Sequence, residues 1–245
     1  TCIACQQLNM KIWRDEFMLL AIQILLGVLF AGTGIGLVVD ISKNRMDELK
    51  GSTGKQWASA FAVGIIANFL DTLGCGSYAP STFMYKLFNQ IDDINIPGTL
   101  NVGDTFPVIF EAFIFTTSVE CDPIFLWVMY ICAAVGSFGF ASIVTKWPRN
   151  KIRIALGTIM IPLAAIMLCK NLGVGPFGIV GTATGLSGWK LIVAAALNIL
   201  WGALMDIGFG LYAPCMATCL LLGVDAATCF PVFMGSCACL MPACS

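Results

Sequence analysis

Residues 17–39, FMLLAIQILLGVLFAGTGIGLVV, contain no charged side chain. A helix needs about 20 mainly apolar residues to cross the hydrocarbon core of a bilayer, so this stretch has the composition of a membrane span. Similar runs recur along the chain. The other segments that the sequence predicts as helical are 57–74, 77–90, 104–119, 123–145, 151–171, 188–207, 211–222 and 225–243. The sequence therefore predicts an all-α, polytopic membrane protein.

The composition also favours a membrane protein over a soluble one. Of the 245 residues, 58% are hydrophobic and 11% are charged, whereas a soluble domain has about 45–50% apolar and about 25% charged residues. The net charge of −1 offers no basic surface, so no nucleic-acid partner is expected. The absence of histidine excludes histidine bases and histidine-containing metal sites. We expect no enzyme activity, no cofactor and no metal.

Lysine and arginine gather in two loops, which sets the predicted topology. The loop 40–56 contains Lys43, Arg45, Lys50 and Lys55, and the loop 146–153 contains Lys146, Arg149, Lys151 and Arg153. Both loops should face the cytoplasm, because basic residues stay on that side. An even number of crossings must then separate them. Segments 57–74 and 77–90 either form a re-entrant hairpin or both cross, and the shortness of 77–90 favours the hairpin.

The second half of the chain repeats the first. Residues 74–80 read GCGSYAP and residues 208–214 read GFGLYAP, with five identities in seven positions. Further on, Thr-Phe-Pro-Val at 105–108 matches Cys-Phe-Pro-Val at 229–232 in the same order. The predicted organisation is a polar N-terminal segment 1–16, a first repeat 17–148 and a second repeat 151–245.

An odd number of crossings in each repeat makes the two repeats inverted relative to each other. Inverted repeats with interrupted helices are a recurring transporter architecture, with the site at the repeat interface. The counterpart of helix 123–145 would begin near position 247, so we expect a truncated chain that lacks its last helix.

These motifs resemble the sulfite exporter TauE/SafE family of bacterial permeases. The matching stretches are DTLGCGSYAPSTFMYKLF (71–88), IPGTLNVGDTFPVIFEAFIF (96–115), GALMDIGFGLYAPCMATCLLLG (202–223) and FPVFMGSCACLMP (230–242). The resemblance implies a multi-pass protein of the cell membrane, in bacteria the inner membrane, built from two similar halves. It implies transport of sulfite, thiosulfate or an organosulfur anion. The implied partners are the lipid bilayer and such an anion.

Each glycine motif is predicted to end one helix and to begin another. Glycine permits backbone conformations that other residues resist, and proline suits the first turn of a helix. The new N-terminus offers free N–H groups and a partial positive charge, so an anion could bind without lysine or arginine. The predicted substrate-binding residues are Gly74, Gly76, Tyr78, Pro80, Ser81, Gly208, Gly210, Tyr212, Pro214 and Cys215. A simple kink for helix packing remains the alternative.

Acidic and other polar side chains lie inside the apolar segments. Intramembrane acids are expensive and point to function, and Glu111 has no acidic counterpart because Gly235 occupies the equivalent position. We therefore expect Glu111 to couple proton movement to anion transport. The predicted polar or coupling residues are Asn68, Asp71, Thr105, Glu111, Asn198, Asp206 and Cys229. Asp71 and Asp206 have helix-end roles as an alternative, and Asp104 is expected to cap helix 104–119.

The 12 cysteines allow a second function. Cys215 follows Pro214 directly and falls in the first turn of a new helix, so a membrane thiol oxidoreductase that uses Cys215 and its neighbouring cysteines is the alternative to a transporter. Close helix packing by small residues is the simpler explanation of the cysteines. A passive channel is a third possibility. Cys2 and Cys5 form a C-x-x-C pair, which without a second pair or a histidine is a weak metal motif.

Overall fold

The computed structural model describes residues 2–46, 51–73, 76–92, 95–144, 181–205 and 210–244, with isolated positions 154, 158, 161, 165 and 168. Within these ranges the regular elements are all helical, and one isolated bridge joins Ala183 to Val224. The prediction of an all-α chain is therefore confirmed for the described residues. Apart from its isolated positions, the predicted segment 151–171 lies outside them.

Most helices begin and end within three residues of the predicted segments. The helices are α1 (Cys2–Asp40), continued by a π-helical turn (Ile41–Arg45), α3 (Gly54–Thr72), α4 (Tyr78–Leu87), α5 (Ile96–Ser118), α6 (Pro123–Val144), α8 (Trp189–Met205), α9 (Tyr212–Leu222) and α10 (Ala226–Cys244). The start of α3 carries a capping box, in which Thr53 and Gln56 satisfy each other's backbone N–H groups. The boundaries therefore follow local sequence signals.

Two helices start more than three residues earlier than predicted. Helix α1 begins at Cys2, since no glycine or proline interrupts residues 2–16, so the N-terminal segment continues the helix of 17–39. Helix α5 begins at Ile96, with Pro97 in its first turn, where the missing N–H costs nothing. The prediction that Asp104 caps a helix is therefore wrong, because Asp104 and Thr105 lie in the interior of α5.

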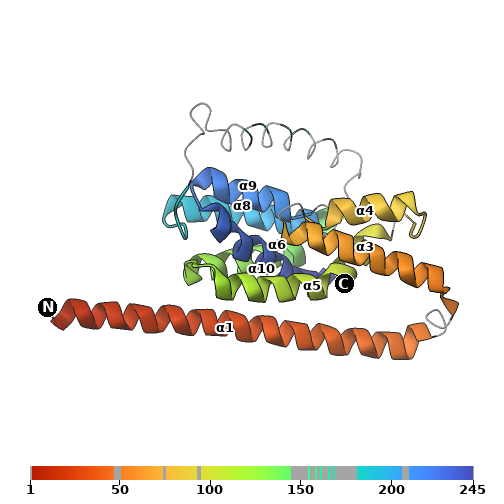
Figure 1. Ribbon diagram of the computed structural model, residues 1–245. Coiled ribbons are helices and arrows are strands. Elements are labelled where there is room, and N and C mark those ends of the chain that lie inside the picture. The colour runs from red at the N-terminus through yellow and green to blue at the C-terminus, as the bar shows by residue number, and fades with distance from the viewer. Residues whose placement is uncertain are drawn as a thin grey trace.

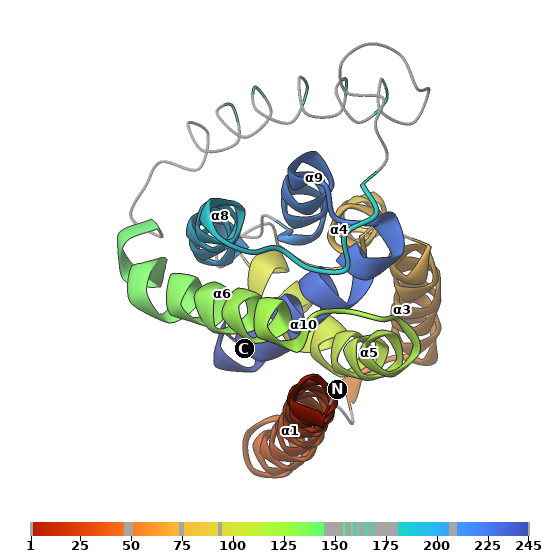
Figure 2. The ribbon, with the colours of Figure 1, turned by 90° about the vertical axis from the view of Figure 1, so that its left-hand side faces the viewer.

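Helix α10 occupies the centre of the bundle, as the end-on view shows (Figure 2). Helices α5 and α6 pack along it, and α9 contacts it as well. Helix α1 lies on one side of the bundle against α5 (Figure 1). The buried core joins residues of these helices, with the Phe125, Tyr130 and Phe233 side chains among its largest members.

Two helical hairpins enter the bundle from opposite ends. One end, here called the Asp122 end, is joined by hydrogen bonds from Asp122 N to Thr184 O at 2.9 Å and from Asp225 N to Ala183 O at 2.9 Å. Helix α8 starts at this end and α9 returns to it. At the opposite end, where α1 gives way to α3, helix α3 runs inward and α4 returns outward (Figure 1). The breaks within both hairpins therefore lie in the middle of the bundle.

Glycines allow α6 and α8 to cross at very short distance. A Cβ atom built on Gly136 would lie 2.0 Å from the carbonyl oxygen of Ile199, and one built on Gly202 would lie 2.3 Å from that of Ala133. In both cases the obstacle is backbone, which cannot move aside as a side chain can. Small residues of this kind let helix backbones approach closely in membrane proteins.

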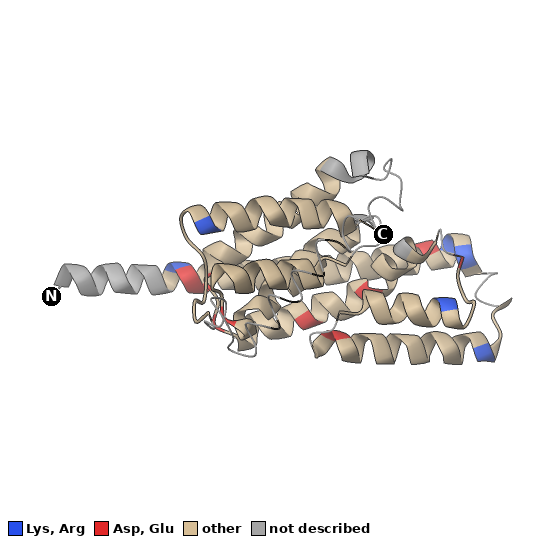
Figure 3. Cartoon of the chain, turned by 90° about the horizontal axis from the view of Figure 1, so that it is seen from above, with Lys and Arg blue, Asp and Glu red and all other residues tan. Residues whose placement is uncertain are grey.

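The charges lie mostly toward the two ends of the bundle, with a few acidic residues between them (Figure 3). One described helix is long and apolar enough to cross a membrane, with its apolar stretch at Trp13–Arg45. Shorter apolar helices are Pro123–Gly139, Trp189–Met205, Tyr212–Leu222 and Ala226–Pro242. A single long helix near the N-terminus is in itself a weak indication of membrane association.

Candidate functional site

The two glycine motifs meet in the middle of the bundle and contact each other reciprocally. A Cβ built on Gly76 would lie 3.7 Å from Cβ of Tyr212, and a Cβ built on Gly210 would lie 3.5 Å from Cβ of Tyr78. The second glycine of each motif thus packs on the tyrosine of the other motif. Because the same pair of contacts occurs in both directions, the two breaks form one shared structure.

Each break leads into the N-terminus of a short helix. Gly76 has a φ of +77°, a conformation that a side chain would strain. The first helical hydrogen bonds run from Ser81 N to Ser77 O and from Cys215 N to Leu211 O, both at 3.0 Å. Pro80 and Pro214 occupy the first turns, as predicted. The first amides of a helix have no partner within it, so both N-termini present N–H groups to the middle of the bundle.

The two tyrosines fasten the hairpins to their surroundings. The Tyr212 hydroxyl donates to the backbone oxygen of Asp71 at 3.0 Å, at the end of α3. The Tyr78 hydroxyl donates to Oδ1 of Asn101 on α5. The Tyr212 ring also packs against Phe233 of α10, tilted by 47°, with ring centroids 3.8 Å apart. The tyrosine of the second motif therefore closes the end of the helix that precedes the first motif.

A cavity of about 540 Å³ opens beside this junction. Both motifs contribute to its wall, together with the ends of α3 and α8 and one face of α10. The lining residues that carry polar groups or belong to the motifs are Asp71, Gly76, Ser77, Tyr78, Ala79, Thr82, Lys86, Gly210, Leu211, Tyr212, Ala213, Pro214 and Cys237. The volume falls in the range of about 300–1,000 Å³ that is usual for small-molecule sites.

The structure brings six of the predicted site residues to this cavity: Asp71, Gly76, Tyr78, Gly210, Tyr212 and Pro214. Pro80, Ser81 and Cys215 lie in the adjoining helix turns but do not line it. Three predicted residues, Gly74, Asp206 and Gly208, lie outside the described residues.

The remaining predicted polar residues make contacts elsewhere. Asn198 is fully buried, and its Nδ2 donates to Met129 O at 2.7 Å and to Ser236 Oγ at 3.2 Å, joining α8 to α6 and α10. The Asn68 amide donates to Gly64 O within α3, and the Thr105 hydroxyl donates to Asn101 O within α5. None of these three lines the cavity.

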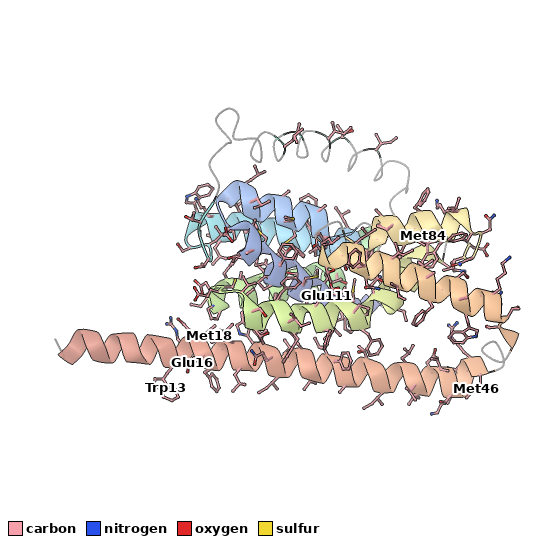
Figure 4. The ribbon with its side chains drawn as sticks, viewed as in Figure 1. Trp13, Glu16, Met18, Met46, Met84 and Glu111 are labelled. Atoms are coloured by element: carbon pink, nitrogen blue, oxygen red, sulfur yellow. The ribbon has the colours of Figure 1, made fainter. Side chains whose placement is uncertain are left out.

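Three buried carboxyl groups lie near one another, and one of them, Asp71, lines the cavity. Asp71 of α3 is 2% exposed, Asp104 of α5 is 6% exposed and Glu111 of α5 is 7% exposed. Each has one oxygen without a hydrogen-bond partner. Glu111 interacts electrostatically with both of the others, and Figure 4 shows it in the interior of the bundle. Neither of the ion pairs within the described residues includes any of the three.

Buried thiols form a second cluster, toward the Asp122 end. Cys219 of α9 interacts electrostatically with Cys215 and Cys121, and Cys229 lies close to it as well. The Cys229 thiol donates to Asp225 O at 3.2 Å. In the loop before α6, burial raises the pKa of Cys121, with smaller contributions from Asp122 and Cys229. A raised pKa makes this thiol a poor nucleophile.

Sequence reasoning missed Ser77 and Lys86 as cavity residues. The sequence predicts an anion site that needs no lysine or arginine, and the structure adds Lys86 to the cavity lining. A signal for it was present, because Tyr78, Thr82 and Lys86 follow one another at a spacing of four residues and therefore share one helix face. No comparable signal in the sequence marks Ser77. It directly precedes the motif tyrosine, and the apolar Leu211 occupies the equivalent position in the second motif.

Comparison of the chain with protein-family models, with curated proteins and with solved structures gives no match in any of the three.

Proposed function

We propose that this protein is a membrane transporter for a small sulfur-containing anion such as sulfite, thiosulfate or an organosulfonate. The observation that carries the proposal is the reciprocal packing of two broken-helix motifs beside a cavity, Gly76 on Tyr212 and Gly210 on Tyr78. Irregular backbone at membrane depth is tolerated where it is buried in protein or lines a cavity. A paired break of this kind is the architecture that transporters use for their substrate site.

The charge of the site supports an anion as substrate. The first turns of α4 and α9 both face the cavity, through Ala79 and Ala213, and a helix N-terminus carries a partial positive charge. Lys86 adds a full positive charge to the lining. Asp71 opposes it, because an ionised carboxylate would repel an anion in the same cavity. The proposal therefore includes a proton that accompanies the anion.

The opposite entry of the two hairpins supports inverted repeats. Helices α3 and α4 enter from one end of the bundle, and α8 and α9 enter from the Asp122 end (Figure 1). Between the basic loop 40–56 and the end of α6, the chain crosses the bundle twice, in α5 and α6. This even number agrees with placing both basic loops in the cytoplasm. The similarity of the motifs to the TauE/SafE permeases supports the same assignment.

Exposed apolar side chains support a multi-pass location in the cell membrane, which in bacteria is the inner membrane. Helix α6 has no charged residue over its 22 positions, yet Ile131 is 54% exposed and Phe138 is 67% exposed. Water-soluble proteins rarely present continuous apolar surfaces of this kind. Contact of this face with lipid would remove the unfavourable exposure of its apolar side chains to water.

Uptake into proteoliposomes tests the function. Purified protein is reconstituted, and uptake of radiolabelled sulfite, thiosulfate and sulfate is measured with and without a pH gradient. We expect saturable uptake of at least one sulfur anion, with counterflow, and stimulation by an inward proton gradient. Protein-free liposomes are the control. Absence of counterflow with linear flux would identify a channel, and absence of flux for all three anions would contradict the proposal.

Glu111→Gln is expected to change the pH dependence of uptake. The substitution replaces one carboxyl of the cluster with Asp71 and Asp104 by a neutral amide. The electrostatic potential at the two remaining carboxyls changes, and so does the pH at which they bind protons. A shift of one pH unit corresponds to about 1.4 kcal/mol, a size that a buried charge supplies readily. The measurement is initial uptake across a series of pH values. An unchanged profile would show that Glu111 does not take part in coupling.

The thiol cluster favours a thiol oxidoreductase as the second candidate, and Cys215→Ala separates the two functions. As a transporter, the variant should keep its uptake and lose about 1 kcal/mol of stability or somewhat more from the small cavity. As an oxidoreductase, it should lose exchange with a small-molecule disulfide. Cys132→Ala, on α6, is the matched control, since Cys132 is not a partner of Cys219. Loss of uptake with retained folding would contradict a purely structural role for Cys215.

A further inference from the structure

We propose that the substrate of this transporter is an organic monoanion with an apolar body of several carbon atoms, such as an alkanesulfonate, rather than an inorganic sulfur anion. The inference rests on the proposed function and deepens it, because it selects one class among the sulfur anions named there. It is drawn from the wall of the cavity beside the two glycine motifs. In small-molecule sites a few polar groups fix the orientation of the ligand, and apolar walls contact its carbon atoms.

The size of the cavity is the first step of the argument. Its volume of about 540 Å³ is that of a site for a drug-sized organic ligand. Sulfite and thiosulfate are ions of only a few heavy atoms, so either of them would leave most of this space to water. A water molecule in a cavity needs about two to four polar partners. The inner wall does not supply them, and a ligand with an apolar body fills the same space at lower cost.

The inner wall is formed by buried apolar side chains from several helices. They come from α5, α8, α10 and the residue that precedes α9, and none of them is more than 2% exposed: Val108, Met205, Leu211, Met234 and Met241. The lining residues Phe83 and Lys86 of α4 are exposed, so the cavity leads from the α4 side into this apolar interior. Methionine fills irregular spaces and adapts to different shapes. The wall therefore suits an alkyl or aryl group better than a hydrated ion.

The polar part of the wall limits the charge of the ligand. Asp71 lines the cavity, is 2% exposed and keeps Oδ1 without a hydrogen-bond partner. Burying a charge is costly unless the charge is paired, and an ionised carboxylate in the same wall adds repulsion. The doubly charged sulfate and thiosulfate ions are therefore disfavoured relative to a sulfonate, which carries one charge. The free N–H groups at the starts of α4 and α9 can bind one such head group.

Binding of an alkanesulfonate series tests the class of ligand without any transport. Isothermal titration calorimetry on the protein in nanodiscs measures Kd for methane-, ethane-, butane-, hexane- and octanesulfonate, and for sulfite and sulfate, with protein-free nanodiscs as the blank. We expect about fourfold tighter binding for each added CH2 group, roughly 60-fold from methane- to butanesulfonate, until the cavity is filled. Sulfite and sulfate should bind more weakly than butanesulfonate. Butanol, which lacks the anionic head, should also bind more weakly.

Two substitutions in the inner wall should change the chain length at which the gain in affinity stops. Met234→Ala enlarges the cavity and should move this limit to a longer chain, whereas Val108→Leu adds a carbon atom and should move it to a shorter one. Met129→Ala is the matched control, because Met129 of α6 is also buried but does not line the cavity. It should leave the limit unchanged. Circular dichroism checks that each variant is folded.

The proposal is overturned if sulfite binds as tightly as butanesulfonate, if affinity does not depend on chain length, or if Met234→Ala and Met129→Ala have the same limit. The last result would mean that the alkyl chains dissolve in the bilayer instead of entering the cavity. Uptake reports separately on the proposed function. Sulfite uptake together with a flat chain-length profile would contradict this ligand class alone. Binding that depends on chain length, without uptake of any anion, would contradict transport alone.

Discussion

Replacing Gly210 with leucine abolishes substrate uptake while the protein stays folded and inserted: this is the expected result for a site built on two facing breaks. A Cβ at this position lies at ordinary contact distance, 3.5 Å, from Cβ of Tyr78. The further carbons of leucine must then displace Tyr78 or enter the cavity. Overpacking of this kind costs about 1–3 kcal/mol, which as a loss of binding corresponds to roughly fivefold to more than a hundredfold.

A graded series makes this prediction specific to the junction. Gly210→Ala should retain much of the uptake, since the first carbon fits. Gly64→Leu is the matched control, because a Cβ at Gly64 of α3 has no atom within 4 Å. Gly76→Leu should also abolish uptake, with the added strain of a side chain at φ +77°. Uptake by Gly210→Leu at the rate of Gly64→Leu would exclude the junction as the substrate site.

The sequence predicted those parts of the site that leave a local signal. The duplicated glycines, the first-turn prolines and the short helices all follow from spacing and backbone preference, and α4 and α9 begin within one residue of the predicted starts. The charges of the flanking loops left a hairpin or two crossings open for α3 and α4, and the shortness of segment 77–90 favoured the hairpin. The duplication of the motif in the sequence did not by itself predict that the two motifs contact each other.

The acidic cluster could not be predicted in the same way. Asp71 and Asp104 come from different helices and meet only because α3 and α5 pack on the same side of the cavity. Sequence reasoning instead placed Asp104 at a helix cap, because the predicted helix starts at 104, about two turns after the start of α5 at Ile96. The polar role of Asn198 was recognised as intramembrane, but its partners Met129 and Ser236 lie on two other helices.

The second large effect is expected at the crossing of α6 and α8, where Gly136→Val should destabilise the fold itself. The new Cβ would lie 2.0 Å from the Ile199 oxygen, 2.8 Å from its carbonyl carbon and 2.9 Å from its Cα. All three atoms are backbone, so α8 must move away from α6 as a body. Separation also weakens the hydrogen bond from Asn198 Nδ2 to Met129 O, which joins the same two helices.

The cost should reach or exceed about 3 kcal/mol, the upper end of ordinary overpacking, because no side-chain rearrangement relieves the clash. Gly139→Val is a close control: it lies on the same helix one turn further along, and a Cβ there has no atom within 4 Å. Thermal unfolding in detergent, followed by circular dichroism, should show a large loss for Gly136→Val and little change for Gly139→Val. Because α8 leads into the second break, the misfolded fraction should also lose uptake. Equal melting temperatures for the two variants would mean that α6 and α8 do not cross at these glycines.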